Sequence, residues 1–294
     1  MKTLHVVIGP TAAGKTAYGI RLAQQLHTEI LSCDSRQFYQ ELNIGVARPT
    51  LDELAAVPHH FIARRTIMQP YNVYDFEQDA LRCLDMLFQT HDEVVAVGGS
   101  GLYVDALCFG VSRMPTPSDE LRMQLKQRFC DEGLTTMFQW LQELDPDYAA
   151  RVDSHNPVRI QRALEVCLTT GRPYSEVVAA QQPVPRPFSC RFHYVDCDST
   201  TLRQRIDSRV DQMLRNGLET EARHLEPLWC SHHPQPLNTV GYKEFYEPLP
   251  DNGNPSAPHS IAEWIKLNTW HYARKQRTWF RKIVNSSIFN IQFP

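Results

Sequence analysis

The sequence feature that most constrains the fold lies near the N-terminus, where residues 9–16 read Gly-Pro-Thr-Ala-Ala-Gly-Lys-Thr. This run matches G-x-x-x-x-G-K-[ST] at every defined position, and it directly follows the apolar segment 4–8. Glycines in such a loop let backbone N–H groups turn inward around an anion, and the lysine adds positive charge. Apolar residues at helical spacing after Thr16 complete a strand, a loop and a helix. The segment therefore predicts a phosphate-binding loop, and the alternative of a plain glycine turn is disfavoured by the full match.

Further strand and helix signals alternate in a way typical of α/β proteins. Segments 29–32 and 93–97 are short apolar runs, and the second ends in a glycine-rich turn at 98–101. Strand character resumes at 192–195. With segment 4–8 these runs predict a parallel sheet flanked by helices, similar to that of P-loop NTPases.

The middle of the chain interrupts this alternation. From Pro115 to about residue 170 the apolar spacing is helical, and a proline-rich run at 183–187 closes the excursion. We therefore predict a helical insertion at 113–187. The core would be formed by 1–112 and 188–294, and the C-terminal part of this core would be mostly helical.

Composition bounds the class of protein. Of the 294 residues, 42% are hydrophobic and 21% are charged, which suffices for a substantial core. No apolar stretch approaches the roughly 20 residues of a membrane span, and no signal-peptide core precedes the first strand. We expect a cytoplasmic protein with no membrane partner.

The eight cysteines include no C-x-x-C pair and form no regular framework. We therefore expect reduced thiols without disulfides. The segment Cys230-Ser231-His232-His233 lacks a second ligand pair at zinc-finger spacing, so we interpret it as a polar loop and expect no zinc.

The net charge of −3 argues against a generic nucleic-acid binder, because nonspecific affinity for phosphate backbones needs many Lys and Arg residues. Positive charge concentrates at 274–282, where it alternates with aromatic residues on a stretch without Gly or Pro from Ile261 to Phe289. This stretch predicts a helix. The sequence leaves open whether its basic residues bind a ligand or only cover a buried aromatic stripe.

Three groups of polar residues are expected near the phosphate loop. Asp34 follows a strand, so it should lie at the carboxyl end of the sheet, where open α/β sheets bind ligands. Its carboxylate could accept a proton or could cap the next helix. The Ser100 hydroxyl could reach a phosphate oxygen from the second glycine turn. Arg205 and Arg209 share a helix face suited to clamping a diphosphate, although a solvated face is the alternative.

Taken in order, these motifs resemble one family, the tRNA dimethylallyltransferases. The resemblance covers almost the whole chain, and the joint order of its motifs is specific although only the first is diagnostic alone. It runs through GPTAAGKT (9–16), SCDSRQFY (32–39), NIGVARP (43–49), PHH (58–60), YNVYDF (71–76), VGGSGLY (97–103), NPVRIQRALEV (156–166), RIDSRVDQMLRNGLETEA (205–222), TVGYKE (239–244) and ARKQRTWFRK (273–282). It implies an enzyme that moves a dimethylallyl group from dimethylallyl diphosphate to N6 of the adenosine 3′-adjacent to the anticodon, in tRNAs that read codons starting with U.

The resemblance also implies roles for individual residues. In this family the loop binds the diphosphate of the prenyl donor rather than driving nucleotide hydrolysis, which implicates Gly9, Pro10, Thr11, Ala12, Ala13, Gly14, Lys15 and Thr16. The Thr16 hydroxyl would ligate Mg²⁺, the implied cofactor. Asp34 matches the general base, and Arg209 would stabilise the leaving diphosphate. Ser100 matches a catalytic position that the family usually fills with Thr, so the hydroxyl is kept.

The anticodon stem-loop of tRNA is the implied macromolecular partner. The matching tRNA-contacting positions are Asp34, Ser35, Arg36, Gln37, Ser100, Arg122, Val158, Arg159, Ile160, Gln161 and Arg162. The helical insertion would embrace the stem-loop, and Gln37 could read an edge of the extruded adenine. Nothing in the sequence demands a second chain, so we expect a monomer.

Three rival functions stay open at this point. A small-molecule or nucleotide kinase would share the loop and a helical lid, but it would transfer the γ-phosphoryl group of ATP. A non-catalytic RNA-binding protein would bind tRNA without a covalent product. A prenyltransferase acting on free adenine nucleotides would be indifferent to tRNA.

Overall fold

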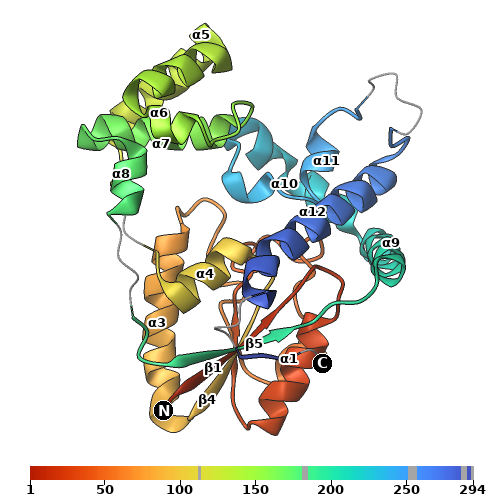
Figure 1. Cartoon of the computed structure of the whole chain (residues 1–294). Helices are drawn as coiled ribbons and strands as arrows, with labels where there is room; N and C mark the ends of the chain where they lie inside the picture. The colour runs from red at the N-terminus through yellow and green to blue at the C-terminus, as the bar shows by residue number, and fades with distance from the viewer. Residues whose placement is uncertain (112–113, 181–184, 251–256, 286–289, 293–294) are drawn as a thin grey trace. The chain divides into compact units, whose positions relative to one another are not determined.

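The structure is a computed structural model that describes residues 1–111, 114–180, 185–250, 257–285 and 290–292 (Figure 1). The chain divides into two compact units. The first unit consists of Met1–Gly110 with Pro185–Pro294, and the second of Val111–Val184. Each unit has a hydrophobic core of its own.

The first unit is built on a parallel sheet. Within the described residues the sheet has six strands in the order β3-β2-β4-β1-β5-β6, and each neighbouring pair is parallel. The strands are β1 Thr3–Ile8, β2 Ile30–Ser32, β3 His59–His60, β4 Glu93–Val97, β5 Ser189–Tyr194 and β6 Asn290–Gln292. The predicted α/β fold is confirmed. The sequence patterns missed β3 and β6, because two or three residues are too few to show a period.

Helices cover both faces of this sheet. Val7 and Val95 pack with Ile20 on one face, whereas Val6 and Phe76 belong to the cluster on the other face. Figure 1 shows α1 and α3 on opposite sides of the strands. The helices of this unit are α1 Lys15–Gln25, α2 Leu51–Ala56, α3 Val73–Thr90, α4 Gly101–Phe109, α9 Ser199–Arg215, α10 Leu218–His232, α11 Lys243–Tyr246 and α12 Ile261–Val284, with a 3-10 turn, η1, at Gln235–Leu237. Burial on both faces explains why the central strands are continuous apolar runs.

The strand register brings three loops together. Val97 at the end of β4 pairs with Val7 of β1 and with Ser32 of β2. The segments that follow β1, β2 and β4 therefore start side by side at the carboxyl edge of the sheet, the edge at which open α/β sheets bind ligands.

The second unit is helical. It consists of α5 Asp119–Leu144, α6 Pro146–Ala149, α7 Pro157–Thr170 and α8 Tyr174–Ala179. Gly133 interrupts α5 with a φ of 78°, a backbone conformation that favours glycine. The Asn156 side chain accepts a hydrogen bond from Arg159 N–H at 3.2 Å and so caps α7.

No helix in the described part of the chain is both long and apolar enough to span a membrane. The eight cysteines are free thiols, and four of them, Cys33, Cys83, Cys108 and Cys167, are buried.

Two histidines are buried between neighbouring strands. His5 Nδ1 of β1 and His193 Nε2 of β5 share a hydrogen bond of 2.9 Å, and His193 Nδ1 shares another of 2.9 Å with the Tyr18 hydroxyl. The two imidazole residues are only 3% and 1% exposed. Burial lowers the pKa of His5, and burial together with the charges of His5 and Arg191 lowers the pKa of His193 to about 4. The folded protein therefore favours neutral rings.

This pair predicts a loss of stability on mild acidification. An unfolded histidine takes up a proton near pH 6.5, whereas folded His193 resists protonation until about pH 4. The free energy of unfolding should therefore fall as the pH drops from 7 to 5, and His193→Asn should make this fall less steep. Urea unfolding across that range measures the slope, with the exposed His224→Asn as control. An unchanged slope in His193→Asn would contradict the prediction.

Candidate active site

The predicted phosphate loop lies between β1 and α1, and α1 begins at Lys15. Gly9 has a φ of +146°, and a side chain there would collide with the Val195 carbonyl. Gly14, with φ +101°, starts α1 from the left-handed region. Lys15 Nζ donates to the Pro10 carbonyl at 2.7 Å. A lysine ammonium and the positive end of a helix therefore meet at the loop.

A cavity of about 380 Å³ opens beside this loop. Its walls come from the loop, the turn after β2, the segment 45–47, the glycine turn after β4, α9, α12 and the segment 238–243, which includes the first residue of α11. The lining residues are Thr11, Lys15, Thr16, Asp34, Ser35, Arg36, Gln37, Gly45, Val46, Ala47, Val97, Gly98, Gly99, Arg209, Val210, Met213, Asn238, Thr239, Val240, Gly241, Lys243, Ile265, Thr269 and Tyr272. The structure thus brings together the phosphate loop, Asp34 and Arg209, which the sequence places far apart.

The two carboxylate oxygens of Asp34 differ in their hydrogen bonds. Its Oδ1 accepts hydrogen bonds from the N–H groups of Arg36 at 2.9 Å and Gln37 at 3.4 Å. No hydrogen bond reaches Oδ2 from the described residues. The carboxylate therefore caps its own turn through one oxygen and keeps the other for a ligand, so capping and proton acceptance are compatible here.

Gln37 lines the cavity, but its amide is occupied within the protein. Nε2 donates to the carbonyls of Ala47 at 3.1 Å and Val46 at 3.4 Å, and Oε1 accepts from the Ser32 hydroxyl at 3.2 Å. Reading an adenine edge would require these bonds to open. The observed geometry makes Gln37 a support for the 46–47 wall of the cavity.

Ser100 lies behind the cavity wall rather than in it. Its hydroxyl accepts from Ser35 N–H at 2.9 Å and donates to Ser35 Oγ at 3.1 Å. Ser100 is 8% exposed. In this structure Ser100 acts on the cavity through Ser35, which lines it.

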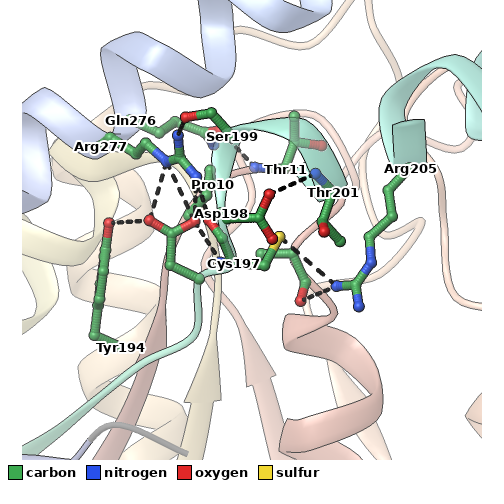
Figure 2. A network of polar contacts seen from close by, with 12 residues as sticks. Pro10, Thr11, Tyr194, Cys197, Asp198, Ser199, Thr201, Arg205, Gln276 and Arg277 are labelled. Atoms are coloured by element: carbon green, nitrogen blue, oxygen red, sulfur yellow. Dashed lines mark hydrogen bonds and ion pairs between the residues drawn. The ribbon is translucent and has the colours of Figure 1, made fainter. Parts of the chain in front are cut away.

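The two arginines expected to clamp a diphosphate have different partners. Arg209 donates to the Thr11 hydroxyl at 3.0 Å and lines the cavity. Arg205 donates to the Ala13 carbonyl at 3.2 Å. It also contacts the Cys197 thiol, and Figure 2 shows this contact. Arg205 is not among the lining residues, so it holds the phosphate loop from outside while Arg209 faces the ligand space.

The two cations of this site, Lys15 and Arg209, repel each other. Burial, followed by repulsion from Arg209, lowers the pKa of Lys15 to about 7, and Asp34 and Asp196 oppose the shift. Burial also lowers the pKa of Arg209, again opposed by Asp34. An anion that enters the cavity would relieve this repulsion.

Helix α12 contributes residues that the sequence did not single out for the site. Tyr272 lines the cavity, and burial and the nearby Asp34 carboxylate raise its pKa to about 12. Arg277 makes a bidentate pair with Asp196, at 3.0 Å and 2.8 Å to the nearest oxygens, and donates to Ser199 Oγ at 2.9 Å (Figure 2). The basic and aromatic composition of this stretch predicted a helix, but it did not show which side chains face the cavity and which face solvent.

Glu221 of α10 shapes another wall. Its carboxylate accepts from the N–H groups of Asn43, Ile44 and Gly45 at 2.9 to 3.3 Å, and from the Tyr242 hydroxyl at 2.5 Å. Gly45 has no room for a side chain because Tyr242 packs against it. The motif residues around 43–45 and 239–244 therefore meet at one carboxylate.

The remaining predicted tRNA contacts belong to the second unit. Val158 is 75% exposed, and Arg159 and Arg122 are exposed as well. Gln161 and Arg162 both donate to Glu165 at 3.1 Å. Ile160 requires a correction, because its side chain is fully buried and its N–H bonds to the Asn156 carbonyl. The structure does not present Ile160 to an RNA ligand.

A divalent cation would find oxygen donors rather than a protein cage. Thr16 lines the cavity, its hydroxyl makes no hydrogen bond to any described residue, and Asp34 lines the same cavity. No group of three His, Cys, Asp or Glu side chains that could hold a metal occurs among the described residues. This donor set fits Mg²⁺ bound through one hydroxyl, water and the oxygens of a phosphorylated ligand.

Comparison with known proteins places this chain in a family. The IPP transferase family profile matches residues 37–283. The tRNA dimethylallyltransferase 1 of Bacteroides thetaiotaomicron is 43% identical over 282 residues, which cover 96% of this chain and 89% of the relative. The tRNA dimethylallyltransferase of Christiangramia forsetii is 44% identical over 276 residues, covering 94% of this chain and 89% of the relative. The chain belongs to the IPP transferase family.

Solved structures agree with this assignment. The full-length tRNA isopentenylpyrophosphate transferase of Bacillus halodurans has a TM-score of 0.67 at 30% identity, and the match covers 100% of this chain and 90% of that chain. A eukaryotic dimethylallyltransferase acting on tRNA has a TM-score of 0.79 at 24% identity, covering 95% and 70%. The second likeness supports the fold alone.

In this IPP transferase, the lowered pKa of Lys15 predicts that anion binding takes up a proton. A lysine with a pKa of about 7 is largely neutral at pH 8.5, and a bound diphosphate favours its charged form. The affinity for inorganic diphosphate with Mg²⁺ should therefore fall as the pH rises above 7, by up to about tenfold per pH unit. Calorimetry in buffers of different ionisation enthalpy measures the proton uptake.

Lys15→Arg is the matched control, because arginine stays charged over this range. Titration of the diphosphate itself contributes equally to both proteins, so the difference reports the lysine. Equal proton uptake by the two proteins would show that Lys15 is already charged in the free site.

Proposed function

We propose that this protein is a tRNA dimethylallyltransferase. It transfers the dimethylallyl group of dimethylallyl diphosphate to N6 of the adenosine 3′-adjacent to the anticodon, in tRNAs that read codons starting with U, and it releases diphosphate. The observation that carries the proposal is one cavity in which Lys15 and Arg209 lie with the Asp34 carboxylate. Membership in the IPP transferase family, and the names of its relatives, support tRNA as the acceptor.

The chemistry follows from the charges around the cavity. The bond between the allylic carbon and the diphosphate oxygen breaks, and its electron pair leaves with the diphosphate. The adenine amine forms the new carbon–nitrogen bond and gives its proton to Asp34 Oδ2. Negative charge grows on the leaving group, so Lys15 and Arg209 stabilise the transition state more than the ground state.

Mg²⁺ would neutralise part of the diphosphate charge when bound, and Thr16 is the protein residue proposed to hold it. Thr11 lies between the cations: its hydroxyl accepts from Arg209, and its neighbour Pro10 accepts from Lys15. These contacts orient the two cations toward one loop before substrate arrives, which reduces the reorganisation needed during reaction.

The acceptor is proposed to contact both units. Ser35 and Arg36 line the cavity beside Asp34, and Val158 and Arg159 are exposed at the start of α7. RNA is read mainly at unstacked bases of loops, so the adenosine would leave its stack to reach Asp34. A tRNA substrate also supports a cytoplasmic location, and we propose a monomer.

The decisive experiment incubates the protein with Mg²⁺, labelled dimethylallyl diphosphate and unmodified tRNA, and then identifies the labelled nucleoside by mass spectrometry. Label on tRNA adenosine is expected, and adenosine monophosphate is the parallel acceptor. Label only on the mononucleotide would assign the protein to free-nucleotide prenylation. No label with either acceptor, together with ATP-dependent phosphorylation of a small acceptor, would assign kinase chemistry.

Asp34→Asn is predicted to lower kcat by at least about 10²-fold. Asparagine keeps an Oδ1 that can accept from the N–H groups of Arg36 and Gln37, so the turn is preserved while the base is lost. Single-turnover rates and tRNA binding should be measured on the same protein, and tRNA affinity should change little. Activity within a few-fold of wild type would rule out Asp34 as the base.

A further inference from the structure

Gln276 of α12 occupies a buried position between two loops of the candidate active site. Its Oε1 accepts from the Thr11 N–H of the phosphate loop at 2.8 Å, and its Nε2 donates to the Gly99 carbonyl at 2.8 Å. The residue is only 5% exposed. The bond to Thr11 is drawn in Figure 2.

The orientation of this amide follows from its partners. An N–H group can only donate and a carbonyl can only accept, so the oxygen must face Thr11 and the nitrogen must face Gly99. Both ends are satisfied, and among side chains of this length only the amide offers one acceptor and one donor at every pH. Gln276 is therefore matched to the gap chemically as well as in size.

Gly99 shows how closely the glutamine approaches. A Cβ at residue 99 would collide with Gln276 Nε2 and would lie 3.4 Å from Lys15 Nζ. The glycine turn after β4 thus leaves room for the amide on one side and for the catalytic-site lysine next to it. A residue with a side chain at this point would displace one of them.

The phosphate loop depends on this contact. Thr11 is held at its N–H by Gln276 and at its hydroxyl by Arg209 at 3.0 Å. Pro10, the preceding residue, accepts from Lys15 Nζ. A shift of Thr11 would therefore move the partners of both cations that face the cavity.

We propose that Gln276 is a positioning residue for the diphosphate site: its amide ties the phosphate loop to the turn after β4 and so fixes Lys15 and Arg209 for binding the leaving group. The proposal rests on the proposed function for the identity of that group. Gln276 acts through Thr11 and Gly99 rather than by touching the substrate.

Two variants separate hydrogen bonding from space filling. Gln276→Met fills a similar volume without polar atoms, and it should raise the dissociation constant for inorganic diphosphate with Mg²⁺ by about tenfold, as expected for a lost buried hydrogen bond. The KM for dimethylallyl diphosphate should rise in parallel, and tRNA affinity should stay within about twofold of wild type, because Gln276 holds the phosphate loop and is not among the proposed tRNA contacts. Gln212→Met, at an exposed position of α9, is the matched control and should change neither.

Gln276→Glu supplies a readout that a packing role would not move. An ionised glutamate can accept from Thr11 N–H but cannot donate to the Gly99 carbonyl, whereas a protonated one can do both. The ratio of kcat/KM for the donor between this variant and wild type should therefore rise by about tenfold as the pH falls from 8.5 to 6, since burial raises a carboxyl pKa. This comparison follows Gln276→Glu and wild type over the same pH range, so it does not depend on whether Gln276→Met folds.

The outcomes are distinct. A Gln276→Met protein that binds diphosphate within about twofold of wild type, or a flat ratio for Gln276→Glu across pH, would overturn the positioning role. If the wild type makes no prenylated tRNA, the proposed function fails, while diphosphate affinity across pH still decides the role of Gln276.

Discussion

Two cations, Lys15 and Arg209, are held near each other in a partly buried site, and much of the first unit is arranged to keep them there. Burial and mutual repulsion weaken the charged form of Lys15, which is why its pKa falls to about 7. Such a site is unfavourable for the empty protein and favourable for an anion with more than one charged oxygen. The repulsion between Lys15 and Arg209 therefore indicates that the site binds an anionic ligand.

The loop that bears Lys15 is short and glycine-rich, so it needs support from elsewhere in the chain. Gly9 lies against the backbone after β5, Arg205 holds the Ala13 carbonyl, and Gln276 holds the Thr11 N–H. These contacts come from segments far along the chain. Arg205 lies 192 residues after Ala13, and Gln276 lies 265 residues after Thr11. The phosphate site is therefore completed only when α9 and α12 have packed on the sheet. This explains why a loop with a common motif can serve an uncommon chemistry: its surroundings, rather than its own sequence, determine what approaches it.

The sequence predicts what is local and periodic. The loop at 9–16, the buried strands and the helical middle segment carry strong patterns, and Asp34 could be placed because a strand end predicts its edge of the sheet. The sequence could not predict which groups from distant segments would become the hydrogen-bond partners of a given polar side chain. Ser100 has a hydroxyl suited to a phosphate, yet it bonds to Ser35, and Gln37 has an amide suited to a base, yet it bonds to Ala47. Both residues are polar groups whose partners lie within the fold, and buried polar groups nearly always find such partners.

Helix α12 resolves the question that its composition left open, and the answer is mixed. Ala273, Phe280 and Ile283 are buried and face the core, as does Gln276, whereas Tyr272 and Trp279 are 39% and 38% exposed. Two of the five basic residues at 274–282, Arg277 and Lys282, pair with carboxylates of the protein, and so does Lys266 earlier in the helix. Arg277 pairs with Asp196 at 2.8 Å, Lys282 with Asp105 at 2.5 Å and Lys266 with Asp211 at 2.6 Å.

The cations that pair with carboxylates of the protein add little affinity for a phosphate backbone, which agrees with the net charge of −3. Its contribution is instead geometric. Tyr272 faces the cavity, Gln276 fixes the phosphate loop, and Arg277 ties the helix to the segment after β5. Of the basic residues at 274–282, Arg277 and Lys282 are engaged within the fold, whereas Arg274, Lys275 and Arg281 are exposed. Recognition of an RNA by such a protein then depends on shape and on a few placed charges rather than on a broad basic surface.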